Sequence, residues 1–179
     1  KTLGIVGVGR IGARVAQIAA LGLNMDILYT DVIDRDDLER DLGAKRVPLN
    51  ELLERSDVVT AHTPATPQTR GMFNADAFAR MKDDALFINA ARGPVVDEPA
   101  IIEALRSGTI GGACLDVFEE EPLAQESPLM GLPNVILSPH KAGQSDTSMR
   151  NMSLVSLDIL RVLRGEEPKY PVNRPSDPR

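Results

Sequence analysis

Residues 7–12, which read Gly-Val-Gly-Arg-Ile-Gly, constrain the fold of this chain more than any other segment. They follow a short apolar run at residues 3–6 and lead into apolar residues at helical spacing. The first glycine of such a loop permits a tight turn, the second lets the backbone approach a ligand, and the third lets the helix pack against the strand. A strand, a glycine loop and a helix N-terminus in this order predict a site for the pyrophosphate of a dinucleotide. The alternative is a tight turn of the same geometry without a ligand.

Asp31 stands at the end of the next apolar run, residues 25–29. A carboxylate about 20 residues beyond the glycine loop binds the hydroxyls of the adenosine ribose and repels a 2′-phosphate. Arg35 lies close by, but the segment has no basic cluster to hold a 2′-phosphate. The pattern therefore favours NAD over NADP.

Composition limits the classes of partner and compartment. The 179 residues carry a net charge of −6, which argues against a general binder of nucleic acid or of an anionic membrane. No apolar run approaches the ~20 residues of a membrane span, and Lys1 opens directly into a strand pattern, so we expect no targeting segment. Cys114 is the single cysteine, stands in an apolar run and is expected to be buried. We expect a cytoplasmic protein.

Apolar runs alternate with helical patterns along the chain. We predict strands near residues 2–6, 25–30, 57–61, 85–89, 111–116 and 135–138. We predict helices at residues 11–20, at 34–41 with an Asp36–Arg40 pair, at 49–55, at 75–81 capped by Asn74, from a cap at Asp97 to about Arg106, and at 147–164 with Gly165 ending the last. This order predicts an α/β fold with a doubly wound parallel sheet.

Three chemically useful groups follow three consecutive predicted strands. Arg92 comes after residues 85–89, the acidic residues 119–121 come after 111–116, and His140 comes after 135–138. In an open α/β sheet, ligands bind beyond the carboxyl ends of the strands. A cation, an anion and a group that titrates near neutrality are therefore expected beside the dinucleotide loop. Each residue alone has an ordinary structural interpretation, and the combination favours a site.

These segments together resemble the NAD-dependent D-isomer-specific 2-hydroxyacid dehydrogenases. The matching segments are residues 7–12, residues 62–71, Asn89-Ala90-Ala91-Arg92-Gly93, Leu115-Asp116-Val117-Phe118 with Glu121-Pro122, and Ser138-Pro139-His140 with Ala142-Gly143. The resemblance runs from Lys1 to about Asn173 and implies a Rossmann-type dinucleotide-binding domain with NAD as its cofactor. No metal is implied.

The resemblance also implies roles for individual residues. Arg92 binds the carboxylate of the substrate, and His140 is the general acid in reduction and the base in oxidation. Glu121 bonds the other ring nitrogen of His140 and fixes its tautomer. Glu119 and Glu120 compete for this role, but only Glu121 directly precedes the proline that matches the family.

Cofactor binding is implied for a larger set. Its members are Gly7, Gly9, Arg10, Ile11, Gly12, Asp31, Thr63, Pro64, Ala90, Ala91, Arg92, Asp116, His140 and Gly143. Among them, Asp116 would hold the nicotinamide carboxamide. His62 is interpreted as a structural or channel-lining histidine.

Three departures from the family stand out. The family often has its ribose-binding aspartate directly after a tyrosine, whereas here Thr30 separates Tyr29 from Asp31. The position that binds the ribose is therefore open by one residue, and the Thr30 hydroxyl is an alternative to the Asp31 carboxylate. Lys141 stands where the family has an apolar residue; we expect it to face solvent, with a place beside His140 as the alternative. Family members are also longer, because a substrate domain surrounds this one. We therefore expect residues 1–173 to form the NAD-binding domain and 174–179 a tail toward a substrate domain that is absent from this chain.

The implied activity is hydride transfer between NAD(H) and C2 of a D-2-hydroxy acid or 2-oxo acid, in a homodimer, with no nucleic-acid or membrane partner. One alternative is an NAD(H)-dependent sensor or scaffold on the same fold. Another is a dehydrogenase of formate or phosphite. The sequence does not identify the hydroxy acid.

Overall fold

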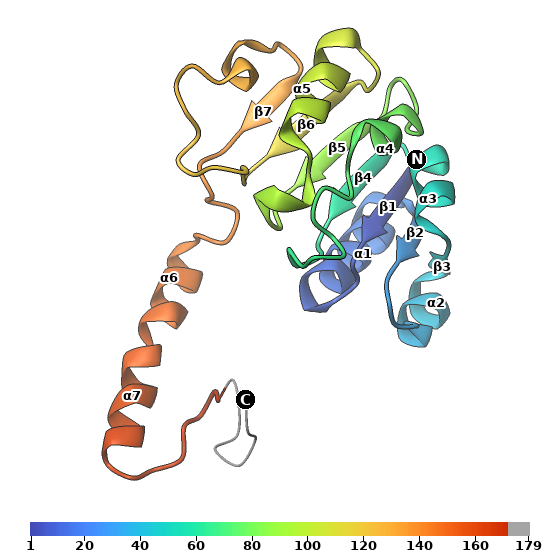
Figure 1. Cartoon of the computed structure of the whole chain (residues 1–179). Helices are drawn as coiled ribbons and strands as arrows, with labels where there is room; N and C mark the ends of the chain where they lie inside the picture. Colours follow the sequence, from blue (N-terminus) through green and yellow to red (C-terminus); the bar gives the residue numbers. More distant parts are fainter. Residues whose placement is uncertain (172–179) are drawn as a thin grey trace. The chain divides into compact units, whose positions relative to one another are not determined.

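Seven parallel strands form one sheet in the computed structural model, which describes residues 1–171 (Figure 1). Their order in the sheet is β3-β2-β1-β4-β5-β6-β7. The strands are β1 (Thr2–Val6), β2 (Asp26–Thr30), β3 (Lys45–Arg46), β4 (Val58–Ala61), β5 (Leu86–Asn89), β6 (Gly112–Leu115) and β7 (Val135–Leu137). The chain reverses its direction of travel across the sheet between β1 and β4, which is where such folds bind ligands.

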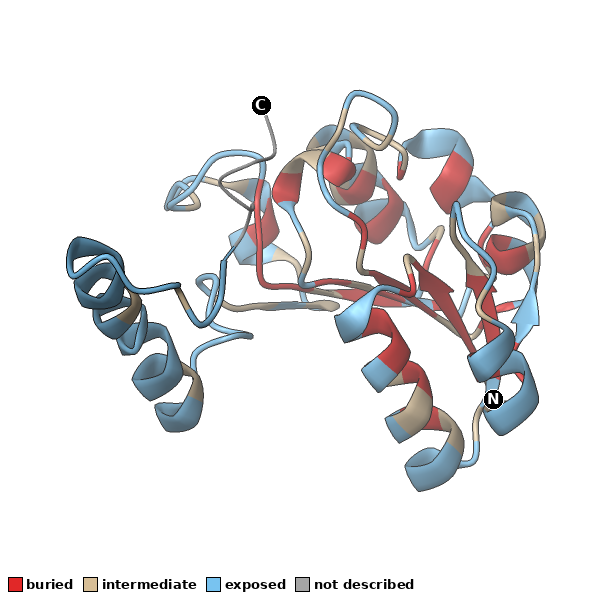
Figure 2. Ribbon diagram, turned by 90° about the horizontal axis from the view of Figure 1, so that it is seen from below, coloured by how far each residue is buried: buried red, intermediate tan, exposed pale blue. Residues whose placement is uncertain are grey.

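Helices cover both faces of the sheet in the unit Lys1–His140 (Figure 2). One face packs against α1 (Arg10–Leu23) and α2 (Asp36–Leu42), and the other against α3 (Leu49–Arg55), α4 (Ala75–Ala79) and α5 (Glu98–Ser107). Short 3-10 turns lie at Gly93–Val95 and Pro128–Gly131. No helix within residues 1–171 is long and apolar enough to cross a membrane.

Alternation along β1 divides the apolar core into two clusters. Ile5 belongs to the cluster under α1 and α2, whereas Val6 belongs to the cluster under α3, α4 and α5. On the second face, the ring of Phe87 lies 4.8 Å from Phe73 and 5.3 Å from Phe78, measured between centroids. All three rings are fully buried. This packing fixes the strands whose carboxyl ends carry the candidate site.

The predicted caps are present and explain where two helices begin. The Asn74 side chain accepts a hydrogen bond from the N–H of Ala77 (3.0 Å), and Asp97 accepts one from Ala100 (3.2 Å). Each bond satisfies a backbone donor that the helix itself cannot pair. α4 ends at Ala79, two residues before the predicted end.

Four further details differ from the sequence predictions. β3 was not predicted, because a polar strand of two residues has no apolar pattern. Arg40 pairs with its neighbour Asp41 (Nε to Oδ1, 2.7 Å) instead of with Asp36. Cys114 is only partly buried.

The fourth concerns the unit Lys141–Arg179, where one long helix was expected. The structure has α6 (Asp146–Ser153) and α7 (Val155–Leu163), with the break at Leu154. There the Ser153 hydroxyl donates to the carbonyl of Met149 (2.9 Å), and the N–H of Leu154 pairs with Asn151, three residues back (3.1 Å). Bonds of this kind compete with the regular helical ladder. Gly165 follows α7 with φ +75°, as predicted. The predicted boundary at residue 173 and the tail 174–179 lie outside the described residues.

Candidate active site

The glycine loop joins β1 to α1 and requires glycine at two positions for steric reasons. Gly7 has φ +94°, and a Cβ there would lie 2.9 Å from the carbonyl of His62. A Cβ on Gly12 would lie 2.1 Å from the carbonyl oxygen of Gly7. Gly9 has open space around it, with no atom within 4 Å of an added Cβ. The loop is thus tightly packed on its protein side and open at its middle residue.

The first turn of α1 offers hydrogen-bond donors beside this opening. The helical ladder begins with the N–H of Ala13, which donates to the carbonyl of Gly9 (2.9 Å). The N–H groups of Arg10, Ile11 and Gly12 precede it and project from the positive end of the helix dipole. Arg10 and Ile11 are exposed. This arrangement fits the pyrophosphate of a dinucleotide.

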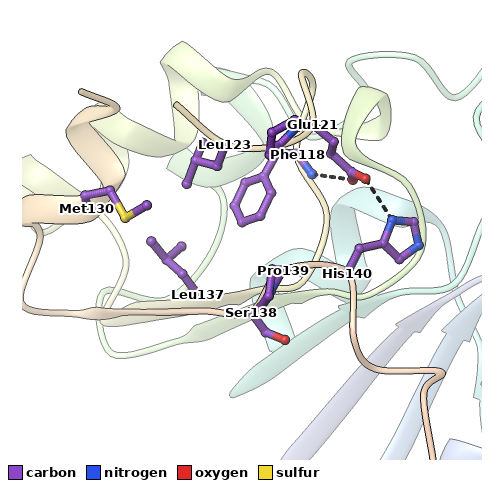
Figure 3. A pocket seen from close by; sticks show the side chains of 9 residues that line it. Phe118, Glu121, Leu123, Met130, Leu137, Ser138, Pro139 and His140 are labelled. Carbon is purple, nitrogen blue, oxygen red and sulfur yellow. Dashed lines mark hydrogen bonds and ion pairs between the residues drawn. The ribbon is translucent and has the colours of Figure 1, made fainter. Parts of the chain in front are cut away.

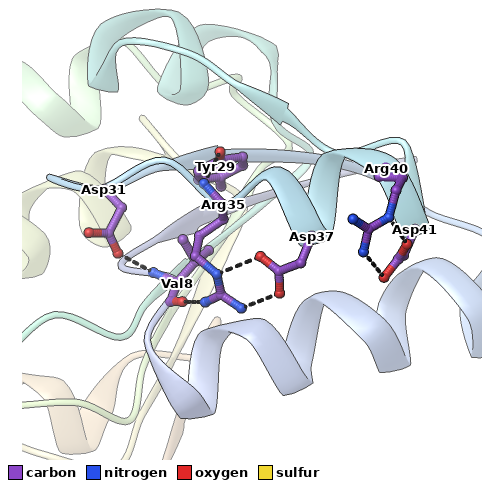
Figure 4. A network of polar contacts seen from close by, with 7 residues as sticks. All are labelled: Val8, Tyr29, Asp31, Arg35, Asp37, Arg40 and Asp41. Carbon is purple, nitrogen blue, oxygen red and sulfur yellow. Dashed lines mark hydrogen bonds and ion pairs between the residues drawn. The ribbon is translucent and has the colours of Figure 1, made fainter.

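Asp31 lies directly beyond β2, against the glycine loop (Figure 4). Its Oδ2 accepts the N–H of Val8 (2.6 Å), and its Oδ1 accepts the N–H of Ile33 (3.2 Å). Thr30 meets the loop through its backbone, because its carbonyl accepts the N–H of Gly7 (2.9 Å). The side chain of Asp31 and the backbone of Thr30 thus both contact the glycine loop, and the role of Asp31 at the adenosine ribose stays a prediction.

The exit of β4 forms the wall beside the glycine loop. Thr63 is buried, and its hydroxyl donates to the carbonyl of Pro64 (3.2 Å). His62 Nε2 lies 3.1 Å from the hydroxyl of Thr60, and burial lowers the pKa of His62. The lowered pKa favours a neutral His62 bonded within the protein, and its predicted role, structural or channel-lining, stays a prediction.

The exit of β5 carries Arg92 on a turn that Asn89 holds closed. The Asn89 amide donates to the carbonyl of Arg92 (3.0 Å) and accepts the N–H of Ala91 (3.1 Å). Nη1 of Arg92 donates to the carbonyl of Ala91 (2.6 Å), and Ala90 is exposed. A Cβ on Gly93 would lie only 1.7 Å from the carbonyl oxygen of Phe118. The turn of Arg92 is thereby pressed against the acidic turn that follows β6.

The exits of β6 and β7 bring Glu121 and His140 together. Oε2 of Glu121 lies 2.8 Å from Nδ1 of His140, and Oε1 accepts the N–H of Phe118 (3.1 Å) (Figure 3). The hydrogen bonds from the His140 ring and the Phe118 N–H hold the pKa of Glu121 below its ordinary value. The residue remains ionised near neutrality and bridges its own turn to the histidine.

Asp116 anchors the backbone beneath this pair. Its carbonyl accepts the N–H of His140 (2.8 Å), and its Oδ1 accepts the hydroxyl of Ser138 (2.6 Å). His140 adopts a left-handed backbone conformation with φ +54°, which is uncommon for a residue other than glycine. Backbone conformations of this kind cluster at functional sites.

A cavity of about 590 Å³ adjoins the pair. It is lined by Phe118, Glu121, Pro122, Leu123, Met130, Leu137, Ser138, Pro139 and His140. Figure 3 shows Met130, Leu123 and Leu137 at one end and Glu121 with His140 at the other. The carboxylate and the imidazole therefore face a largely apolar surface.

The structure brings together most of the predicted site. The glycine loop, Asp31, Thr63, Arg92 and the Glu121–His140 pair all lie at the carboxyl edge of one parallel sheet. The catalytic and cofactor roles of these residues stay predictions, as does that of Gly143, which belongs to the unit Lys141–Arg179, described by itself. In that unit Lys141 is exposed and donates to Oε1 of Gln144 (2.7 Å).

Several residues contribute in ways that were not predicted from the sequence. Ser138 bonds Asp116, Asn89 shapes the turn of Arg92, and Arg35 donates from Nη1 to the carbonyl of Val8. Ser138 and Asn89 lie in segments that match the family, which is a usable signal. Nothing in the sequence marks the bond from Arg35 to the glycine loop.

The sequence matches one family of known proteins. Residues 1–142 match the family model for the NAD-binding domain of D-isomer-specific 2-hydroxyacid dehydrogenases. Glyoxylate reductase of Korarchaeum cryptofilum (strain OPF8) is 47% identical over 175 residues, which are 97% of this chain and 52% of that protein. The chain thus spans about half the length of this curated relative.

Solved structures agree. D-lactate dehydrogenase with NAD+ from Lactobacillus jensenii superposes with a TM-score of 0.87 at 36% identity, over 97% of this chain and 56% of that one. An acyclic imino acid reductase in complex with NADPH and D-Arg gives a TM-score of 0.80 at 30% identity, over 94% and 52% of the two chains. On the match to the family model and the likeness to these proteins, the chain belongs to the D-isomer-specific 2-hydroxyacid dehydrogenase family and contains its NAD-binding domain.

Proposed function

We propose that this chain is the cofactor-binding half of an oxidoreductase that transfers hydride between NAD(H) and C2 of a D-2-hydroxy acid or 2-oxo acid. The observation that carries the proposal is the 2.8 Å contact between Glu121 and His140, at the edge of the sheet that also bears the glycine loop. The names of the relatives, a glyoxylate reductase and a D-lactate dehydrogenase, support the class of substrate.

The glycine loop and the end of β2 would hold the cofactor. The N–H groups of Arg10 and Ile11 would bind the pyrophosphate, and Asp31 would bind the adenosine ribose. Nicotinamide, when bound, supplies the hydride in reduction and accepts it in oxidation.

His140 would move the proton that accompanies hydride transfer. Ionised Glu121 accepts a hydrogen bond from Nδ1–H, which leaves Nε2 as the position of proton exchange with the substrate oxygen. In reduction Nε2–H donates its proton to the carbonyl oxygen, and in oxidation Nε2 accepts the proton of the hydroxyl. The carboxylate also stabilises the imidazolium that forms when the proton is taken up.

Arg92 would bind the carboxylate of the substrate. A guanidinium presents two parallel donors to a carboxylate and stays charged at all working pH values. Asn89 shapes the turn of Arg92, and Gly93 packs it against the acidic turn that also carries Glu121, which supports this role. A bound carboxylate with the carbonyl toward His140 is the geometry that the reaction needs.

We further propose that residues 1–173 act together with a substrate domain of the kind that the longer relatives have room for, in a cytoplasmic homodimer. A second wall over the sheet edge is needed to exclude water from the reacting groups. We therefore expect the chain by itself to bind NADH weakly and to reduce 2-oxo acids slowly or not at all.

The test has two parts. NADH is titrated into the chain, and oxidation of NADH is followed with glyoxylate, hydroxypyruvate and pyruvate in the protein completed by its substrate domain. His140→Asn is expected to lower kcat by roughly 10²–10⁴-fold, the usual contribution of a general acid–base group. Glu121→Gln is expected to lower kcat with little change in KM and to alter the pH profile, because the amide no longer favours the imidazolium.

Glu120→Gln is the matched control, since it removes an adjacent, exposed carboxylate. Equal effects of the two glutamine variants would remove the special role of Glu121. Full activity of His140→Asn would contradict the proposed function, as would failure of the wild-type protein to bind NADH. Light scattering measures the oligomeric state.

A further inference from the structure

Two guanidinium groups lie around the end of β2, and each is held by a carboxylate. Arg35 makes a paired contact with Asp37, from Nε to Oδ1 (2.8 Å) and from Nη2 to Oδ2 (2.7 Å). Arg46 bonds Asp34 through Nη1 and the carbonyl of Asp31 through Nη2 (2.6 Å). With Asp31 itself, three carboxylates face two guanidinium groups at the proposed adenosine end of the cofactor.

Arg35 and Asp31 bind the two polar groups of one residue in the glycine loop (Figure 4). The N–H of Val8 donates to Asp31 (2.6 Å), and the carbonyl of Val8 accepts Nη1 of Arg35. The Arg35 side chain is only 21% exposed, whereas that of Asp37 is 50% exposed. A cation is therefore fixed against the same residue of the glycine loop as the carboxylate that would receive the ribose.

An arginine near this position is the group that accommodates the 2′-phosphate of NADP in dinucleotide-binding folds. The planar guanidinium donates two parallel hydrogen bonds to two oxygens of one anion. A carboxylate bound in this way therefore uses the same N–H donors that a phosphate needs. In this chain Asp37 occupies one edge of the guanidinium through Nε and Nη2, and the carbonyl of Val8 accepts a third hydrogen bond, from Nη1.

We propose that Asp37 is a determinant of cofactor specificity: it occupies the Nε and Nη2 donors of Arg35 at the glycine loop, so that these donors do not bind a 2′-phosphate and the site selects a 2′-hydroxyl. The proposal rests on the proposed binding of NAD(H) at the glycine loop. It makes the preference for NAD a property of two carboxylates. Asp31 acts on the ribose itself, and Asp37 acts through Arg35.

A purely structural role for Asp37 leads to a different expectation. The residue stands in the first turn of α2, where a carboxylate stabilises the helix dipole. Loss of that interaction alone would lower the thermal stability and change the binding of both cofactors by the same factor. A specificity role changes the ratio of the two dissociation constants.

The experiment measures Kd for NADH and NADPH in wild type, Asp37→Asn, Arg35→Gln, the Asp37→Asn/Arg35→Gln double variant and Asp41→Asn. Asp41→Asn is the matched control: it removes a carboxylate of the same helix that pairs with Arg40. The chain has no tryptophan, so cofactor fluorescence is read without that background. Isothermal titration provides a second reading.

Asp37→Asn is expected to shift the ratio of Kd values about tenfold toward NADPH, mainly through tighter NADPH binding, because the Nε and Nη2 donors of Arg35 are released to the phosphate. The shift should vanish in the double variant and be absent in Asp41→Asn. An unchanged ratio in Asp37→Asn, or a shift that persists without Arg35, would overturn the inference. If wild type binds neither NADH nor NADPH, the proposed function itself fails, which separates the two cases.

Discussion

Gly9 and Gly12 belong to one loop, yet replacing each by alanine should damage different properties. The space around Gly9 is open, with φ −63° and ψ −163°, values that alanine adopts without strain. The space at Gly12 is filled by the backbone of Gly7, 2.1 Å from an added Cβ. We expect Gly9→Ala to impair cofactor binding and Gly12→Ala to impair folding.

The magnitude follows from these contacts. Ordinary van der Waals contact begins near 3.4 Å, so Gly12→Ala forces two backbone segments apart by more than 1 Å. Such overpacking costs about 3 kcal/mol or more, and the better helix propensity of alanine offsets about 1 kcal/mol. The net loss of about 2 kcal/mol lowers Tm by about 4–8 °C in a protein of this size. For Gly9→Ala, a poorer N-cap costs at most about 1 kcal/mol.

The assays are thermal unfolding by circular dichroism and titration with NADH. Gly9→Ala should unfold within about 4 °C of wild type while its Kd for NADH rises tenfold or more, since its Cβ occupies the space that the pyrophosphate needs. Gly131→Ala, at another open position, controls for the added methyl group. Wild-type NADH affinity in Gly9→Ala would refute the placement of the anion on this loop.

Three further outcomes are expected. Phe87→Ala should lower the free energy of unfolding by about 3–5 kcal/mol in a denaturant titration, because the ring is fully buried between two other rings. Leu86→Ala, at a neighbouring position that is 46% exposed, should lower it far less. The pKa of Asp57 is held low by a backbone N–H and then by lysine ammonium groups, so its contribution to stability is fully present above its unfolded-state pKa and is lost as the pH falls toward its folded-state pKa. The advantage of wild type over Asp57→Asn in urea titrations should therefore stay constant above about pH 5 and shrink progressively as the pH falls below about 4. A difference that stays constant down to about pH 2 would contradict this. Gly93→Ala should lower Tm and disturb the turn of Arg92, because the added Cβ would overlap the carbonyl of Phe118. An unchanged Tm would show that the turn after β5 and the turn after β6 are not in close contact.

Local rules of sequence were sufficient for most of the sheet. The strands from β1 to β7 other than β3 are apolar runs that lie between helices, and a buried parallel strand needs no other pattern. Asn74 and Asp97 correctly predicted where two helices begin, because a helix cap is a hydrogen bond between residues three apart in the sequence. The break at Leu154 was not predictable in this way, since apolar spacing continues across it and backbone bonding decides the local geometry.

For the candidate site, too, some features were predictable from the sequence and others were not. Sequence alone determined which chemical groups are present, from the glycine loop to Arg92, Glu121 and His140, because motif spacing and strand order place them at one edge of a parallel sheet. Only the tertiary structure decided which atoms are in contact. Glu121 and His140, 19 residues apart, approach to 2.8 Å, and Asp37 forms two hydrogen bonds with Arg35, which also bonds the glycine loop. Such contacts depend on side-chain direction and on turns packed by tertiary contacts, which no periodicity encodes.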